Sequence, residues 1–171
     1  MKTRFITLLL AQFLCLSSFS GNIKNKYKSY LTEKGTVYFI MPQKMPKAEN
    51  STAHKDLIFD VTCINTSDTV AVTATIHTTN PIKDSLVVLT IPHGKTYSVP
   101  TIVIYRDLNK KGYTNRLKFN IAKSTFSELF NASLPFYIDY GNGCTFAFKT
   151  KTWVEEQRLI NGIMNLMELD N

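Results

Sequence analysis

Two carboxylates are the first residues of this chain that could perform acid–base chemistry. Asp60 lies in the segment DLIFDVTCI and Asp139 in PFYIDYG, and each is placed among apolar neighbours as strand residues are. Two such carboxylates facing one another would suit a glycosidase, which needs a pair of acidic groups at a set separation. Polar positions on the solvent face of a sheet explain the same pattern. A hydrolase built on Asp60 and Asp139 is therefore one alternative.

Cys144 is the second candidate for chemistry, as a nucleophile. It follows Gly-Asn-Gly in the segment GNGCTF, and His93 could act as its base. Cys144 also alternates with Phe146 and Phe148, which places it on the apolar face of a predicted strand. The chain contains no Gly-x-Ser-x-Gly motif. We therefore expect core packing at Cys144 and favour a chain that is not an enzyme.

The sequence predicts neither a metal site nor a cofactor. The three histidines, His54, His77 and His93, do not have the close spacing of paired metal ligands, and Cys63 and Cys144 do not form a Cys-x-x-Cys pair. A zinc site usually gathers three or four such ligands. The segment IPHGK has too few glycines for a phosphate-binding loop.

Residues 1–20 have the layout of a cleaved secretory signal. A basic start is followed by about twelve apolar residues, and small residues precede a cut before Gly21. The apolar run is shorter than the roughly 20 residues that span a bilayer. Leu14 disfavours lipid attachment at Cys15, because that reaction needs a small residue before the cysteine. We expect a secreted or periplasmic protein without a transmembrane span.

Loss of this leader would leave two cysteines, Cys63 and Cys144. A disulfide between them would close a loop of about 80 residues and contribute about 4 kcal/mol. Both residues also fall on predicted core faces, Cys63 beside Phe59 and Val61. Two buried, unpaired thiols explain the pattern equally well, so the disulfide stays an open alternative.

The net charge of +7 comes from scattered lysines. No nucleic-acid-binding signature accompanies them, and export argues against such a partner. A basic surface predicts at most a weak attraction to anionic surfaces such as glycans, lipopolysaccharide or membranes.

Alternating β-branched residues separated by turn residues predict a mainly β chain. The polar residues 21–34 form a lead-in that is mobile or lies at a sheet edge, and residues 35–171 form a single domain. Residues 42–55 are expected as a long loop, and residues 124–132 as a short helix. Strands and hairpins are predicted at residues 35–41, 56–79, 85–91, 101–108, 114–122 and 135–150.

The end of the chain predicts an amphipathic helix at residues 152–169, with a capping box formed by Thr152 and Glu155. Its apolar stripe could pack on the sheet of the same domain or dock a partner. The stripe consists of Trp153, Ile160, Ile163, Met164 and Met167.

Together these segments predict an antiparallel β-sandwich or a strongly curved sheet of about eight strands. An open barrel with the last helix as plug or lid is the alternative. The function expected is a secreted or periplasmic, non-enzymatic binding module for a protein or glycan. Besides the hydrolase, the alternative is a β fold that binds a small apolar or anionic molecule, lined by Tyr97, Tyr105, Tyr113, Tyr137 and Tyr140.

Overall fold

The computed structural model describes residue 23 and residues 25–82 and 86–169. The predicted leader, with Cys15 and the cut before Gly21, lies outside these residues. Among the described helices, none has the length and apolar character needed to cross a membrane.

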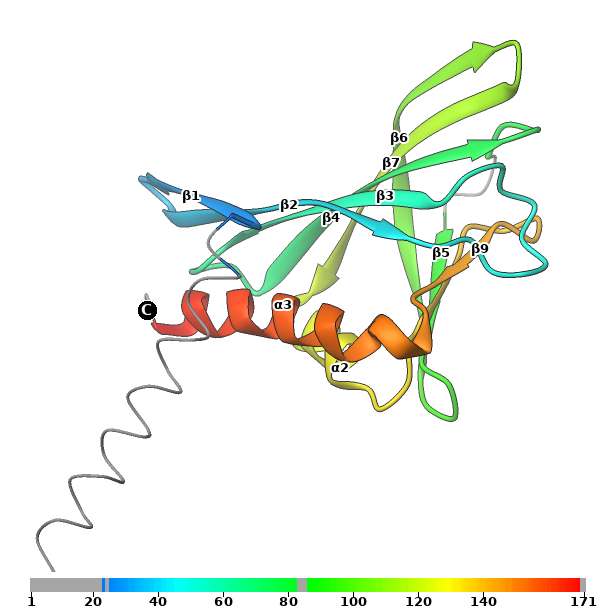
Figure 1. Cartoon of the computed structure of the whole chain (residues 1–171). Coiled ribbons are helices and arrows are strands. Elements are labelled where there is room, and N and C mark those ends of the chain that lie inside the picture. The colour runs from blue at the N-terminus through cyan, green and yellow to red at the C-terminus, as the bar shows by residue number, and fades with distance from the viewer. Residues whose placement is uncertain (1–22, 24, 83–85, 170–171) are drawn as a thin grey trace, which may run out of the picture.

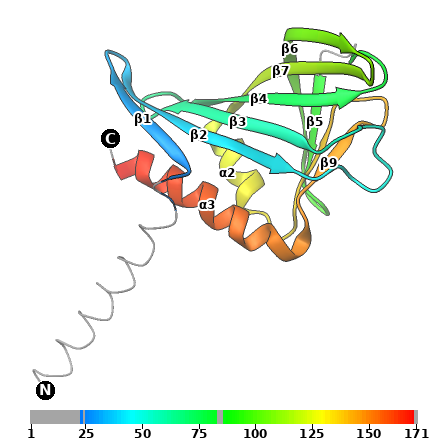
Figure 2. The same ribbon diagram turned by 45° about the horizontal axis from the view of Figure 1, so that its top comes forward.

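Within these described residues, nine antiparallel strands form one sheet, in the order β1-β2-β3-β4-β7-β6-β5-β8-β9. The sheet curls into a half-barrel around α2, and α3 runs beneath it from the β9 end towards the β1 end (Figures 1 and 2). We call the face towards the helices the inner face. The elements are β1 (Tyr27–Thr32), β2 (Gly35–Met45), β3 (Leu57–Ile64), β4 (Thr69–Thr78), β5 (Leu86–Thr90), β6 (Thr96–Asn109), β7 (Gly112–Ala122), α2 (Lys123–Asn131), β8 (Tyr137–Asp139), β9 (Thr145–Ala147) and α3 (Thr150–Leu169).

The strongly curved sheet is the predicted alternative that the structure confirms. The described strands belong to one sheet, so the fold is not a sandwich of two packed sheets. The inner face carries the alternating apolar residues of the central strands. In β4, for example, Val70, Val72, Ala74 and Ile76 are buried, while the residues between them are half-buried. The helices cover this face, because a sheet with one apolar face needs a second layer against it.

Near the start of the chain, the lead-in lies at a sheet edge, as one of its two predicted alternatives states, and the segment after it differs from the prediction. Part of the lead-in forms β1, whose side chains are mostly exposed and whose backbone pairs with β2. β2 continues through Pro42 to Met45, where a loop was expected. A register shift between Ile40 and Gln43 interrupts the pairing of β2 with β3. Such a bulge tolerates a proline, because the ladder is already broken there.

The chain that follows β2 meets β9, the last strand of the sheet order, at one end of the half-barrel. The residues that follow β2 bond to β9: Ala48 N–H donates to the Thr145 carbonyl at 2.9 Å and Ala147 N–H to the Pro46 carbonyl at 3.0 Å. A β-bridge joins Lys47 and Phe146. The hollow is therefore closed by backbone contacts here, whereas α3 lies across its open side (Figure 2).

The helix α3 begins at Thr150, two residues before the predicted start. The predicted capping box does not set this start, because Thr152 lies within the helix and its hydroxyl donates to the Lys149 carbonyl. The five residues of the apolar stripe are all buried. Trp153 stacks on Phe130 at a ring-centroid distance of 5.7 Å, and its indole N–H donates to the Ala132 carbonyl.

Candidate functional site

The second half of β6 is an apolar strand that the rest of the molecule leaves uncovered. Residues 102–109, which we call the distal segment of β6, are all exposed. Five of them are large and apolar, with exposed fractions between 40% and 66%: Ile102, Val103, Ile104, Tyr105 and Leu108. Most soluble chains avoid a contiguous apolar surface of this kind unless it binds something.

Apolar side chains lie on both faces of the distal segment. Ile102 is opposite Lys118 and Tyr105 is opposite Arg116 in the register with β7, so both lie on the outer face. Val103 is opposite the buried Leu117 and therefore lies on the inner face. A register shift between Val103 and Tyr105 marks a bulge at this point. Neither layer of the molecule covers the strand here.

The outer edge of the distal segment is open. β5 pairs with β6 only from Thr96 to Pro100, and within the described chain no strand pairs with that edge beyond Pro100. The other edge is bonded to β7 as far as Asn109. An exposed, apolar edge strand is a ready template for pairing with another chain. The β6–β7 hairpin stands out from the body of the sheet in Figure 1.

A buried amide anchors this hairpin near its turn. Asn115 of β7 is fully buried, and its side-chain carbonyl accepts hydrogen bonds from Arg106 Nε at 3.1 Å and Ile82 N–H at 3.4 Å. Its amide donates to the Thr78 hydroxyl at 3.0 Å. Arg106 also donates to the Ile82 carbonyl. The connection after β4 is thereby tied to the inner side of the hairpin.

The turn of the hairpin requires a glycine. Gly112 has φ of +117°, and a Cβ there would lie 2.4 Å from the Thr78 carbonyl oxygen. Lys110 and Lys111 precede it in the turn and are exposed. The turn thus places two ammonium groups beside the exposed apolar strand.

The carboxylates predicted for acid–base chemistry lie apart in the sheet and have structural partners. Asp60 is in β3 and Asp139 in β8, and the sheet order places β4, β7, β6 and β5 between these strands. Asp60 accepts from Arg116 at 2.9 Å, and Asp139 accepts from the Gly141 N–H at 2.7 Å. Asp60 therefore forms a cross-strand ion pair, and Asp139 stabilises a turn.

The Cys63–Cys144 disulfide that the sequence left open is absent, because both residues are free and buried. Cys63 lies beside Met167 near the end of α3, whereas Cys144 follows β8 and bonds to the Tyr140 backbone. Burial raises the pKa of the Cys63 thiol to about 11 and that of Cys144 to about 12, the charge of Asp139 adding to the latter shift. A thiol that stays protonated is a poor nucleophile.

The apolar face of α3 is used by the domain's own core. Trp153, Ile160, Ile163, Met164 and Met167 pack beneath the sheet, which is the first of the two alternatives predicted for this stripe. The structure gives no support to docking through this face, because the stripe is buried within the described part of the chain.

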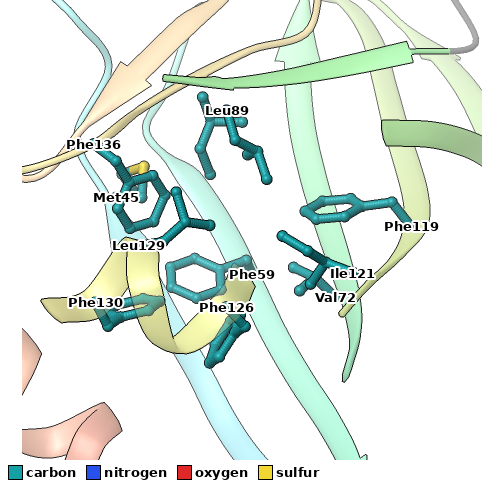
Figure 3. Close-up of a pocket in the computed structure, with 11 residues that line it drawn as sticks. Met45, Phe59, Val72, Leu89, Phe119, Ile121, Phe126, Leu129, Phe130 and Phe136 are labelled. Carbon is teal, nitrogen blue, oxygen red and sulfur yellow. The ribbon is translucent and has the colours of Figure 1, made fainter. Parts of the chain in front are cut away.

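Two hollows lie beside the helices of the described structure. The first is an apolar cavity between α2 and the inner face of the sheet, with a volume of about 20 Å³. Figure 3 shows its labelled side chains converging from the sheet and α2. It could hold about one water-sized group, whereas ligand pockets measure roughly 300 Å³ or more. No tyrosine lines it; the lining includes Phe59, Phe119, Phe126, Phe130 and Phe136.

The second hollow is an open groove of about 650 Å³ beside α2 and α3. Its lining is mostly polar, and it includes Lys123, Ser124, Ser127, Asn131, Asn161, Asn165, Asp68 and Glu168. Several of these groups already bond to one another or to nearby backbone. Asn161 donates to the Asn131 side chain at 2.7 Å, and Lys123 to the Asn65 carbonyl at 3.0 Å.

The described residues contain no group of three or more His, Cys, Asp or Glu side chains that could hold a metal ion. Comparison with protein families, with curated proteins and with solved structures found no significant match to this chain.

The distal segment of β6 was predicted as a strand, but its exposure was missed. The segment TIVIYRDL contains four consecutive apolar residues, Ile102 to Tyr105, and such a run usually indicates a strand that is buried on both faces. The signal that could have distinguished the two cases is the turn Asn-Lys-Lys-Gly directly after the run. A charged hairpin turn places the preceding strand next to solvent.

Proposed function

We propose that this chain is an exported, non-enzymatic interaction module that binds a protein partner through the distal segment of β6. The observation that carries the proposal is the exposure of five large apolar side chains on a strand with an open edge. Native proteins usually blunt such edges with charges, prolines or a covering element. A partner that covers this strand would remove the apolar surface from water.

The rest of the molecule supports a binding role. The hydrogen bonds of Asn115 and the glycine turn hold the hairpin in place, so little conformational entropy is lost when a partner binds. The structural roles of Asp60, Asp139 and Cys144 offer no support for the hydrolase alternative. Export is supported by the leader-like residues 1–20.

Site-specific photo-crosslinking in the native host tests this function. A benzoylphenylalanine is placed at position 104 or 108 in the distal segment, and at position 151 as an exposed control on α3. We expect one discrete adduct from positions 104 and 108 and none from position 151. The same adducts from all three positions, or no adduct from position 104, would reject the proposal.

The groove beside α2 and α3 favours a second candidate, the binding of a small polar molecule, because its volume of about 650 Å³ suffices for one. A fragment screen followed by NMR tests it. A fragment that binds the groove should change the NMR chemical shifts of three side-chain amides, those of Asn131, Asn161 and Asn165. These changes should disappear in the variant Asn165→Leu. If no fragment in the screen changes these chemical shifts, this function is excluded.

A further inference from the structure

The open edge of β6 has the backbone groups that an added strand needs. In an antiparallel ladder, about half of the N–H and C=O groups of an edge strand point away from its neighbour. In the distal segment these groups point away from β7, and within the described chain no other strand bonds to them. An extended peptide can bind such an edge through its main chain and can place alternate side chains on the two faces.

Apolar surface is available to both sets of side chains of an added strand. Ile102 and Tyr105 are exposed on the outer face, and Val103 and Leu108 on the inner face of the hairpin. Cross-strand pairs of aromatic and β-branched residues are the contacts that stabilise a sheet. The edge is therefore suited to a strand that is itself partly apolar.

The charges around this edge specify the other side chains of the partner. Lys110 and Lys111 are exposed in the turn, and Lys118 is exposed beside Ile102. None of these three lysines takes part in the ion pairs found among the described residues, which involve Lys44, Lys95 and Arg116. The distal segment itself contains one acidic residue, Asp107. An acidic partner would gain from these ammonium groups.

The following inference rests on the proposed function. We infer that the distal segment of β6 binds an extended segment of a partner protein as an additional β-strand. The partner's segment alternates apolar with acidic residues. A second copy of this chain is a poorer occupant. It would bring the same three lysines to the junction, and without Lys2 and Arg4 of the predicted leader each copy would still carry a net charge of +5 in place of +7, so that like charges would oppose the pairing.

The test uses two synthetic nine-residue peptides and the isotope-labelled protein from residue 21 onward. One peptide alternates valine with glutamate, and the other alternates valine with lysine. NMR titration is expected to shift the backbone amides of residues 102–109 with the acidic peptide, with cross-strand contacts to the peptide backbone. The basic peptide should bind at least about tenfold more weakly, because like charges repel it.

Paired variants separate the edge from general charge effects. The double variant K110E/K111E should weaken binding of the acidic peptide by about tenfold or more, whereas K149E/K151E makes the same charge change at the start of α3 and should leave binding nearly unchanged. I102S/I104S should abolish binding. Y30S/L31S removes exposed apolar side chains from the β1–β2 hairpin and should have no effect.

Several results would overturn the inference. These are unchanged amide signals in residues 102–109 at about 1 mM acidic peptide, equal binding of both peptides, or binding that K149E/K151E weakens as much as K110E/K111E. A concentration-dependent dimer that I102S/I104S abolishes would assign the edge to a second copy. Binding to phosphatidylglycerol vesicles in place of the acidic peptide would assign it to a membrane surface. If the photo-crosslink at position 104 still forms, the proposed function stands and only strand addition fails.

Discussion

At the scale of single residues, the ion pair of Asp60 and Arg116 shows how a predicted catalytic group serves the fold. The Asp60 side chain is 9% exposed and lies 2.9 Å from the guanidinium of Arg116, which also donates to the Thr75 hydroxyl. Together these contacts join β3, β4 and β7 on the outer face of the sheet. The carboxylate is therefore committed to cross-strand packing.

Removal of Arg116 should be costly. In Arg116→Ala the Asp60 carboxylate is left buried without its cation, and we expect the free energy of unfolding to fall by about 3 kcal/mol. Lys44→Ala breaks the exposed pair with Asp56, whose atoms are 3.0 Å apart, and should cost less than about 1 kcal/mol. Urea denaturation measures both. Equal losses would show that the Asp60–Arg116 pair behaves as an ordinary surface ion pair.

Tyr140 offers a stabilising substitution. Its side chain is buried, and within the described chain its hydroxyl has no hydrogen-bond partner. Removal of an unsatisfied buried hydroxyl should raise the free energy of unfolding by about 1 kcal/mol in Tyr140→Phe. Tyr137→Phe, at an exposed ring, is the control and should change little. Thermal denaturation measures the stability of both variants. If Tyr140→Phe destabilises the protein, the Tyr140 hydroxyl has a hydrogen-bond partner and the prediction is wrong.

The thiols of Cys63 and Cys144 should be unreactive in the folded protein. Burial raises the pKa of Cys63 to about 11 and of Cys144 to about 12, so at pH 8 almost no thiolate forms at either position. A disulfide-exchange reagent is expected to label neither residue in the native chain from residue 21 onward, and both after unfolding in denaturant. No labelling after unfolding would instead indicate that the disulfide exists.

At the scale of secondary-structure elements, α3 is a structural layer. Trp153 stacks against Phe130 and packs at a ring-centroid distance of 5.4 Å from Phe148, so it joins α3 to α2 and to the chain after β9. This cluster explains why the helix cannot leave the sheet without exposing aromatic core.

Truncation of this side chain separates core packing from docking. Trp153→Ala should lower the free energy of unfolding by about 3–5 kcal/mol, because it opens a cavity and frees the Ala132 carbonyl from its indole donor. Val154→Ala changes an exposed neighbour and should cost less than about 0.5 kcal/mol. Calorimetry of both variants is decisive: a stable Trp153→Ala protein would mean that α3 is detachable.

The elements themselves were largely predictable, and the environment of each element was not. Strict alternation in residues 56–79 predicted the β3–β4 hairpin, which the structure confirms. The distal segment of β6 carries a similar apolar signal, yet it has solvent on both faces. The local sequence pattern indicates which residues prefer to form a strand. The exposure of that strand depends on which other elements lie beside it. Sequence order could not show that β5 stops pairing at Pro100.

At the scale of the whole molecule, cleavage of the predicted leader would set the form in which the protein acts. Intact-mass spectrometry of the exported protein should show a chain that begins at Gly21, carries no lipid and keeps both cysteines reduced. Protein recovered from the cytoplasm of cells with blocked export is the control and should retain residues 1–20. A lipid on Cys15, or an exported chain that keeps the leader, would contradict the predicted cut.

The contact between the chain after β2 and β9 also determines when the fold can be completed. Pro46 pairs with Ala147, about 100 positions later in the chain, and pairings of such long sequence separation form slowly. The half-barrel therefore cannot close until nearly the whole chain is available. A nascent chain that must wait for its last strand keeps its early strands unpaired at that end. This delay would favour passage through a translocation channel in an unfolded state, and it would make folding on the far side the step most exposed to aggregation.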